Sequence, residues 1–157
     1  MIFQLDKATE FPDPRYGNED GFYAVGGKVT AEMLIKAYPM GIFPYFAFRE
    51  EPIIWWAPQK RFVIFSNEVH VSHSMRNLIN KRRYRCTVNQ AFPDVIAGCA
   101  CTDQRIEEYN AWLGPDLIDT WMDLNEEGYA KSVEVWDGDI LVGGLYGFVC
   151  GRAFIGD

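Results

Sequence analysis

The chain has 157 residues, of which 48% are hydrophobic and 24% are charged, and its formal net charge is −7 at pH 7. This composition is that of a folded globular chain, and the length allows one ordinary domain with a real core. The negative charge argues against a generic nucleic-acid binder, and no apolar run approaches the roughly 20 residues that span a bilayer. Because the start of the chain also lacks a signal-peptide pattern, the sequence predicts a cytoplasmic protein.

The first predicted helix precedes an aromatic segment. Thr30 is suited to cap this helix, and Pro39 and Gly41 would end it. Its apolar face would consist of Met33, Leu34, Ala37 and Tyr38. Residues 41–58 (GIFPYFAFREEPIIWWAP) then hold six aromatic side chains and three prolines. Such a rigid segment forms either ordinary core or the wall of a binding pocket, and the residues alone favour neither.

Helices and strands alternate in the rest of the chain. Ser72 is suited to cap a helix through Ile79, and Asn89 to cap another that reaches Cys99. A further helix would begin at Pro115 and end before Gly128. The predicted strands are residues 84–88, 129–136, 139–149 and 152–155, with a hairpin turn at residues 137–138. This alternation indicates a mixed α/β (α+β) fold.

Two adjacent glycines interrupt the predicted strand at residues 139–149. Gly143 and Gly144 carry no side chain in a segment that is otherwise rich in large apolar residues. They indicate either a β-bulge or backbone that is left bare for a ligand.

The cysteines and histidines predict no metal site. The chain has no C-x-x-C pair, and no histidine lies at ligand spacing from a cysteine. We therefore interpret all four cysteines as small buried hydrophobic residues. They are Cys86, Cys99, Cys101 and Cys150. The two histidines also lack an obvious partner, which is more typical of structural than of catalytic residues.

A basic run stands out in this acidic chain. It contains no acidic residue and consists of Arg76, Lys81, Arg82, Arg83 and Arg85. One interpretation is a solvated helix end, where positive charge complements the helix dipole. The other is a patch that contacts phosphate groups. Composition alone favours the solvated helix end.

The last predicted strand lies close to the final residue. A sheet that stops there would keep an exposed edge with unpaired backbone groups. We therefore expect the chain to be cut short of its natural end.

Five motifs follow one another along the chain. In order, they are GFYAVGG (21–27), AYPMGIFPYF (37–46), PIIWWAP (52–58), GYAKSVEVW (128–136) and LVGGLYG (141–147). Together they resemble the leucyl/phenylalanyl-tRNA–protein transferase family over nearly the whole chain. The resemblance implies a small N-terminal α/β domain at residues 1–59. It further implies the first part of an acyl-CoA N-acetyltransferase-like domain at residues 60–157.

The resemblance implies an aminoacyltransferase. Such an enzyme moves leucine or phenylalanine from an aminoacyl-tRNA to the N-terminal amine of proteins that begin with Arg or Lys, which marks them for degradation. Because the aminoacyl ester is already activated, no metal or other cofactor is expected. A monomer without membrane contact is implied as well. Two other functions stay open: an acyl-CoA-dependent N-acetyltransferase, for which the glycine-rich pyrophosphate turn is missing, and a non-catalytic RNA- or peptide-binding fragment.

The family's site residues carry over to five positions. Its aminoacyl pocket falls on Tyr45, Trp112, Leu145 and Phe154, with Tyr45 in place of the usual tryptophan. Asp157 matches a family glutamate that is one methylene longer, and it is the candidate catalytic acid. The basic run is expected to hold the tRNA acceptor stem through its phosphates. Other functional residues of the family are expected beyond residue 157, so the chain alone is expected to be inactive and marginally stable or aggregation-prone.

Overall fold

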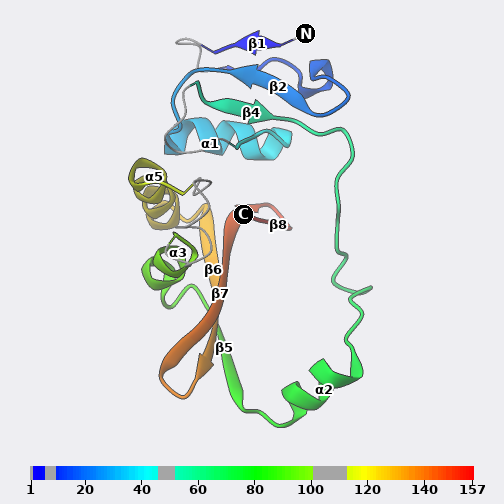
Figure 1. Cartoon of the computed structure of the whole chain (residues 1–157), viewed down its shortest axis with the longest axis vertical. Coiled ribbons are helices and arrows are strands. Elements are labelled where there is room, and N and C mark those ends of the chain that lie inside the picture. Colours follow the sequence, from blue (N-terminus) through cyan, green and yellow to red (C-terminus); the bar gives the residue numbers. More distant parts are fainter. Residues whose placement is uncertain (1, 6–9, 46–51, 101–112) are drawn as a thin grey trace.

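The N-terminal part of the chain forms one of two β-sheets. The structure is a computed structural model that describes residues 2–5, 10–45, 52–100 and 113–157 (Figure 1). Four strands form the first sheet in the order β1-β2-β4-β3. The elements are β1 (Phe3–Gln4), the 3-10 helix η1 (Pro14–Tyr16), β2 (Phe22–Val25), α1 (Ala31–Ala37), the 3-10 helix η2 (Tyr38–Met40), β3 (Phe43–Pro44) and β4 (Ile54–Trp56).

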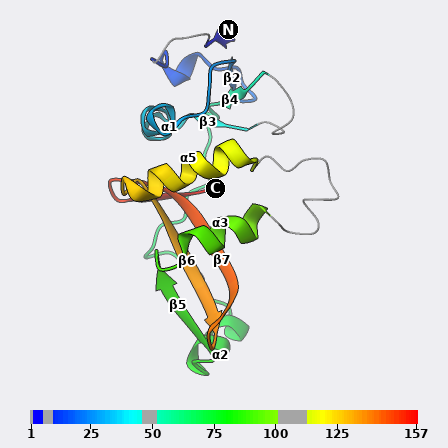
Figure 2. The ribbon, with the colours of Figure 1, turned by 90° about the vertical axis from the view of Figure 1, so that its left-hand side faces the viewer.

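The second sheet is antiparallel and has the order β5-β6-β7-β8. Its part of the chain contains α2 (His73–Asn80), β5 (Tyr84–Val88), α3 (Phe92–Ala100), α5 (Pro115–Glu126), β6 (Ala130–Asp137), β7 (Ile140–Cys150) and β8 (Ala153–Gly156). Figure 2 shows α3 and α5 side by side over one face of this sheet. The predicted mixed α/β fold is confirmed. None of the helices in the described ranges has the length and apolar character needed to cross a membrane.

The predicted helix boundaries follow from local hydrogen bonds. The Thr30 side chain accepts a hydrogen bond from the Met33 backbone N–H at 3.3 Å and thereby caps α1. The Ser72 side chain caps α2 in the same way, through the Met75 N–H at 3.2 Å. Gly41 ends η2 with a φ of 74°, a left-handed conformation that favours glycine. These caps confirm the predicted starts of α1 and α2 and the predicted stop at Gly41.

The start of α3 corrects the prediction that Asn89 caps it. α3 begins only at Phe92, and the Asn89 side chain instead accepts a hydrogen bond from Asn125 at 2.6 Å. The free backbone N–H groups before α3 are bound by Glu134 of β6, which is fully buried and accepts from Gln90 at 3.2 Å and from Ala91 at 3.4 Å. Glu134, from the distant strand β6, therefore binds the backbone N–H groups that a local capping residue was expected to bind.

Burial and hydrogen bonding act on Glu134 in opposite directions. Burial raises the pKa of its carboxyl group, but hydrogen bonds from Ser132, Thr87 and the two backbone N–H groups outweigh burial and lower the pKa overall. Glu134 thus stays ionised at neutral pH and fixes α3 to β6.

An aromatic cluster joins the two sheets into one hydrophobic core. The Tyr38 ring stacks on Phe148 of β7 with centroids 4.9 Å apart and meets Trp121 of α5 edge-on at 5.8 Å. Trp121 in turn meets Tyr146 at 5.1 Å. All four rings are buried. α1 and η2 of the first sheet therefore pack directly on α5 and β7 of the second.

The aromatic segment at residues 41–58 contributes partly to this core. Trp55 is completely buried, and its indole N–H donates to the Gly26 carbonyl oxygen at 3.0 Å. The Trp55 ring also meets Phe11 at 5.0 Å. Phe46 and Phe48 lie outside the described residues. For Trp55, ordinary core is the correct interpretation.

The expectation of four buried cysteines is wrong for Cys86. Cys86 lies exposed on β5, because this strand is an edge strand and helices cover only one face of the sheet. Cys99 and Cys150 are half-buried, and Cys101 lies outside the described residues. No group of three or more potential metal ligands occurs among the residues that the structure describes.

Gly143 and Gly144 have separate structural roles. The pairing of β6 with β7 shifts between Val135 and Trp136, opposite Gly143, which confirms the β-bulge interpretation. A Cβ atom on Gly144 would lie 2.8 Å from the Val95 side chain of α3. A Cβ atom on Gly143 would meet only the Val135 side chain, at 3.9 Å. Gly144 therefore lets α3 pack closely on β7.

Replacing Gly144 by alanine is expected to destabilise the fold. The added methyl group must push α3 away from β7, and overpacking of this kind costs about 1–3 kcal/mol of unfolding free energy. Gly143→Ala is the matched control, since its methyl group has ordinary contact distances. Chemical denaturation of both variants measures the difference. Equal stability of the two variants would contradict this account of the helix packing.

Candidate substrate-binding face

The second sheet has one face that α3 and α5 do not cover. Alternate residues of a strand share a face, so Leu145, Gly147 and Val149 of β7 point to the same side. Their partners are Val133 of β6 opposite Leu145, and Gly156 and Phe154 of β8 opposite Gly147 and Val149. This open face lies toward the chain segment that connects the two sheets (Figure 1).

Leu145 and Phe154 meet on this open face. A Cβ atom placed on Gly156 would lie 3.5 Å from Leu145 Cδ1 and 3.9 Å from Phe154 Cε1. A Cβ atom on Gly147 would lie 2.9 Å from Phe154 Cζ and closer still to the Ile155 carbonyl oxygen. The two side chains therefore lie over two glycines. Leu145 is 47% exposed and Phe154 is 42% exposed, so both offer apolar surface to a ligand.

The other two predicted pocket residues are not part of this pair. Tyr45 follows β3 in the first sheet, where its backbone N–H donates to Ile54 and its side chain is exposed. Trp112 lies outside the described residues. The structure thus brings together the Leu145–Phe154 half of the predicted pocket.

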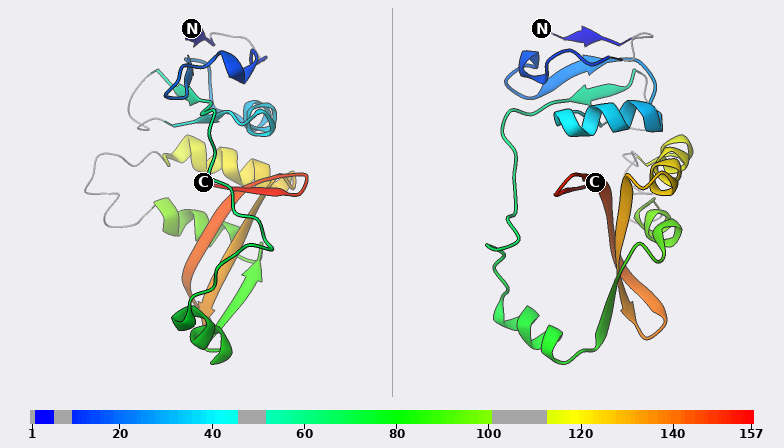
Figure 3. Two further views of the ribbon diagram at one scale, coloured as in Figure 1. Left: turned by 90° about the vertical axis from the view of Figure 1, so that its right-hand side faces the viewer. Right: turned by 180° about the vertical axis from the view of Figure 1, so that it is seen from behind.

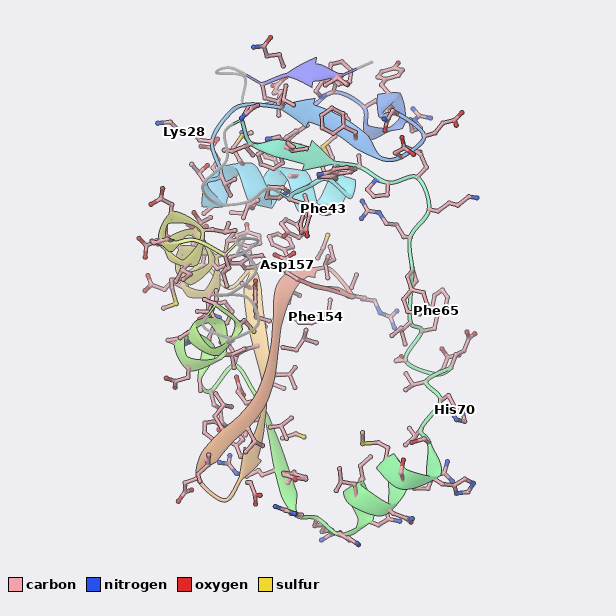
Figure 4. All side chains as sticks on the ribbon, viewed as in Figure 1. Lys28, Phe43, Phe65, His70, Phe154 and Asp157 are labelled. Carbon is pink, nitrogen blue, oxygen red and sulfur yellow. The ribbon has the colours of Figure 1, made fainter. Side chains whose placement is uncertain are left out.

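Asp157 lies at the junction of the two sheets. Its carboxyl oxygen accepts a hydrogen bond from the Tyr38 hydroxyl at 2.9 Å, and its backbone N–H donates to the Tyr146 carbonyl at 3.2 Å. In Figure 4 it lies beside Phe154, close to the N-terminal sheet. Asp157 thus lies at the end of the strand that carries Phe154, but its carboxyl group points toward Tyr38, because residues that follow each other in a strand point to opposite sides of the sheet.

The surroundings of Asp157 shift its pKa toward neutrality. Although the residue as a whole is exposed, its carboxyl group lies against the protein, and this desolvation raises its pKa to about 6. The hydrogen bond from Tyr38 acts in the opposite direction. Burial, together with the negative charge of Asp157, raises the pKa of the Tyr38 hydroxyl well above its ordinary value. Tyr38 therefore remains a donor, and Asp157 can gain or lose a proton near pH 6.

Sequence reasoning missed Tyr38 as a part of this site. The helical pattern assigned it to the apolar face of α1, and the residue is indeed buried. A buried tyrosine hydroxyl usually needs a hydrogen-bond partner, which was the available signal. Nothing in the local sequence indicates that this partner lies 119 positions further along the chain.

The basic run divides into two groups. Arg83 forms an ion pair with Asp137 at 2.7 Å, which raises the pKa of Arg83, and the Arg85 guanidinium lies 5.1 Å from the Trp136 ring centre. Within the described ranges, the other three residues form no ion pair. They are Arg76, Lys81 and Arg82, and we call them the free basic group. Among the described residues, these three differ from Arg83 and Arg85 in having neither an ion pair nor a ring contact.

The free basic group lies on and beside α2. Arg76 is a residue of α2, Lys81 is its C-cap and Arg82 follows with a φ of 51°. Met75, Leu78 and Ile79 of α2 are exposed, and α2 contains no buried residue. In Figure 1, α2 lies at the far end of the second sheet from β8, so the basic group and the Leu145–Phe154 pair occupy different regions.

Comparisons with known proteins agree on one family. The family model described as leucyl/phenylalanyl-tRNA protein transferase matches residues 63–157, and the model of its N-terminal domain matches residues 27–59. The leucyl/phenylalanyl-tRNA–protein transferase of Anaeromyxobacter sp. is 41% identical over 156 residues, which cover 99% of this chain and 66% of that protein. The Flavobacterium johnsoniae protein of the same name is 40% identical, and the alignment covers 99% of this chain and 73% of that protein. The chain thus spans about two thirds of the length of such relatives.

Replacing Tyr38 by phenylalanine is expected to raise the pKa of Asp157 above its value of about 6. The hydrogen bond from the hydroxyl stabilises the ionised carboxylate, whereas the ring that stacks on Phe148 is kept. An NMR titration of the side-chain carboxyl carbon of Asp157 measures the midpoint. Tyr129→Phe is the control, since its ring also stacks on Phe148, at 5.8 Å. A midpoint that stays the same or falls in Tyr38→Phe would contradict the hydrogen bond.

Asp157 is also expected to make stability depend on pH. Its folded pKa of about 6 exceeds the ordinary value of 3.8, so the folded state binds more protons between these values. The contribution of this group to stability is therefore full below pH 3.8 and is lost as the pH rises through 6. Asp157→Asn should flatten that part of the curve of unfolding free energy against pH. An unchanged slope between pH 4 and 6 would contradict the raised pKa.

Proposed function

The chain belongs to the leucyl/phenylalanyl-tRNA–protein transferase family, and we propose that it serves the transfer of leucine or phenylalanine from an aminoacyl-tRNA to the N-terminal amine of a protein. The observation that carries this proposal is about 40% identity to proteins of that name over almost the whole chain. We further propose that the acceptors begin with Arg or Lys, that transfer marks them for degradation, and that the enzyme works as a monomer in the cytoplasm. The proposed domain boundary lies between residues 59 and 60.

The reaction needs positioning and proton transfer rather than a cofactor. The acceptor amine attacks the carbonyl carbon of the aminoacyl ester, so that an amide bond forms and the ester bond to the tRNA breaks. The amine loses a proton, and the departing tRNA hydroxyl gains one. Holding the two reactants together supplies a large share of the rate enhancement. A base near the amine supplies another share.

We propose that Leu145 and Phe154 bind the side chain of the transferred amino acid. Their half-exposed apolar surfaces lie together over Gly147 and Gly156, where neither glycine carries a side chain that would fill the site. An apolar surface of this kind discriminates by only about 1–3 kcal/mol per methylene group. It would therefore accept leucine and phenylalanine alike. Tyr45 and Trp112 are proposed to complete the pocket.

We propose that Asp157 accepts the proton of the acceptor amine. A carboxyl group with a pKa of about 6 is about 90% ionised at pH 7, and it is a stronger base than an ordinary aspartate. The Tyr38 hydroxyl would hold the carboxylate in place, since the two groups are 2.9 Å apart. A cationic acceptor residue would also be attracted to this charge.

The free basic group is proposed to hold the tRNA. Arg76, Lys81 and Arg82 form no ion pair with a described residue, so they can bind phosphate groups without giving up an internal partner. Contacts to phosphates position a nucleic acid but do not read its sequence. Arg83 and Arg85, which already contact Asp137 and Trp136, are proposed to contribute less.

The transfer assay uses a chimera in which this chain replaces the aligned part of the Anaeromyxobacter sp. relative. The chimera is mixed with tRNA that carries labelled phenylalanine and with a peptide that begins with Arg. Label is expected to move to that peptide and not to a matched peptide that begins with Glu. Acetyl transfer from acetyl-CoA, without any transfer from the charged tRNA, would refute the proposed function.

Leu145→Ala and Phe154→Ala are each expected to reduce kcat/KM for transfer by about 5- to 150-fold, because each removes about 1–3 kcal/mol of contact with the amino acid. Thermal unfolding should change little, since both side chains are about half exposed. Ile140→Ala, which removes an exposed apolar side chain at the start of β7, is the control. If the two variants lose stability but keep their activity, Leu145 and Phe154 are structural residues.

Replacing Lys81 and Arg82 by glutamine is expected to weaken binding to different tRNAs to a similar extent. Each lost phosphate contact should lower the slope of log affinity against log salt concentration by about one. Fluorescence anisotropy at several salt concentrations measures affinity and slope. Arg83→Gln, which removes a charge that is paired with Asp137, should change the slope less. Equal slopes for the parent and the double variant would show that the free basic group does not contact phosphates and is a solvated helix end.

A further inference from the structure

The N-terminal part of the chain contains a pocket beside the start of the segment that connects the two sheets. Its volume is about 350 Å³, which is within the usual range for sites that hold small molecules. Its walls come from η1, from η2 with Gly41, and from the residues that follow β4. Beyond these walls, residues 59–72 form no helix or strand and run away from the first sheet (Figure 3). Three segments that are distant in the sequence therefore meet around one cavity.

Side-chain hydrogen bonds hold these three segments together. The Gln59 amide donates to the Pro14 carbonyl oxygen at 3.1 Å and to the Ala57 carbonyl oxygen at 3.4 Å. The Arg61 guanidinium donates to the Gly41 carbonyl oxygen. The bonds to Pro14 and Gly41 link the residues after β4 to the two other walls. The shape of the pocket is therefore fixed by contacts within the fold.

Arg61 is a cation without an anionic partner. Its guanidinium lies 5.2 Å from the centre of the Phe43 ring, whose place Figure 4 marks. Within the described ranges, Arg61 forms no ion pair. Partial burial lowers the pKa of Arg61, and no described carboxylate opposes this effect. Because a guanidinium group has five N–H donors, the contacts with Gly41 and Phe43 leave donors for an anion.

Gly41 keeps the pocket open next to Arg61. A Cβ atom on Gly41 would lie 3.2 Å from Arg61 Nη2, which is closer than ordinary van der Waals contact. The φ of 74° at Gly41 also favours glycine. The backbone can therefore approach the guanidinium closely, and a bound group can reach Arg61 without meeting a side chain at position 41.

The other lining cation is already neutralised. Arg15 donates to Asp13 through Nε at 3.0 Å and through Nη2 at 2.5 Å. Among the described residues, no acidic side chain lines the pocket. Arg61 is thus the cation that lacks compensation, and a ligand with a single negative charge would match it. A phosphate monoester carries a charge of about −1.5 to −2 at pH 7 and would exceed this match.

The rest of the wall is mainly apolar. It includes the partly exposed Met40 and three prolines, which are Pro14, Pro39 and Pro58. Proline has no backbone N–H, so these positions offer apolar surface in place of hydrogen-bond donors. Methionine adapts to apolar groups of different shapes. A ligand that fits this pocket therefore has an apolar body next to its negative charge.

We propose that this pocket binds a small organic carboxylate, with its carboxylate paired to Arg61 and its apolar body against Met40 and the prolines. A carboxylate accepts two parallel hydrogen bonds from a guanidinium group, which orients the ligand as well as binding it. None of the residues of the Leu145–Phe154 pair or of the free basic group lines the pocket. The proposal therefore does not rest on the proposed function.

The test is a titration of the 157-residue chain with phenylacetate, followed through the backbone amide signals of Gly41 and Gln59 in NMR spectra. Saturable shifts are expected. Phenylacetamide has nearly the same shape without the charge and should bind at least about tenfold more weakly. Arg61→Gln should weaken phenylacetate binding by a similar factor, because the charge-assisted pair is lost. Arg152→Gln, which removes an exposed charge in the turn before β8, is the matched control and should bind like the parent chain.

Met40→Glu is a second variant that keeps Arg61 itself. Met40 is exposed, so thermal unfolding should change little. The new carboxylate would occupy or repel the site of the ligand, and the shifts with phenylacetate should disappear. This variant decides between the outcomes if Arg61→Gln does not fold.

The proposal would be overturned by the absence of saturable shifts, or by equal binding of phenylacetate and phenylacetamide. Unchanged binding in Arg61→Gln and Met40→Glu would overturn it as well. In each of these cases, Arg61 serves only to attach the connecting segment to the first sheet. Tighter binding of benzyl phosphate than of phenylacetate would overturn the assignment to carboxylates.

Discussion

The Tyr38 ring lies between Phe148 and Trp121, and this contact makes one core out of two sheets. Aromatic pairs in such stacked and edge-on geometries contribute about 0.5–1.5 kcal/mol each beyond their buried area. The covalent connection, residues 59–72, runs apart from both sheets and cannot fix their relative position. Sliding of one sheet past the other would break both ring contacts and the hydrogen bond to Asp157. The aromatic cluster therefore determines where the candidate acid lies.

The candidate site depends on β8 in the same way. This strand carries Phe154, provides Gly156 beneath Leu145, and leads directly to Asp157. The apolar pair and the acid are thus placed by one short strand that pairs only with β7 among the described strands. Close approach at Gly147 fixes β8 against β7, since a larger residue there would collide with the Ile155 backbone. Gly147, Gly156 and the edge strand β8 therefore position Leu145 and Phe154 on the open face, whereas α3 and α5 cover the opposite face.

Local chemistry made part of this arrangement predictable. Thr30, Ser72 and Gly41 act through neighbours within a few residues, so their caps and stops follow from the sequence. Asn89 failed as a cap because Glu134 of the distant strand β6 accepts hydrogen bonds from the backbone N–H groups of Gln90 and Ala91. The Tyr38–Asp157 contact joins residues 119 positions apart and has no local signal. Periodicity predicts an apolar face such as that of α1, but it does not say what will cover it.

Acidic and basic side chains lie in different regions around the second sheet. The exposed acids of α5, including Asp116, Asp119 and Asp123, lie on the face that the helices cover. The free basic group lies beyond the far end of the sheet, on and after α2. Surface charges are screened over about 8 Å at physiological salt, so a polyanion senses these regions separately. It would be repelled from α5 and attracted to α2. This separation of charge is what the proposed binding of tRNA by the free basic group requires in a chain with a net charge of −7.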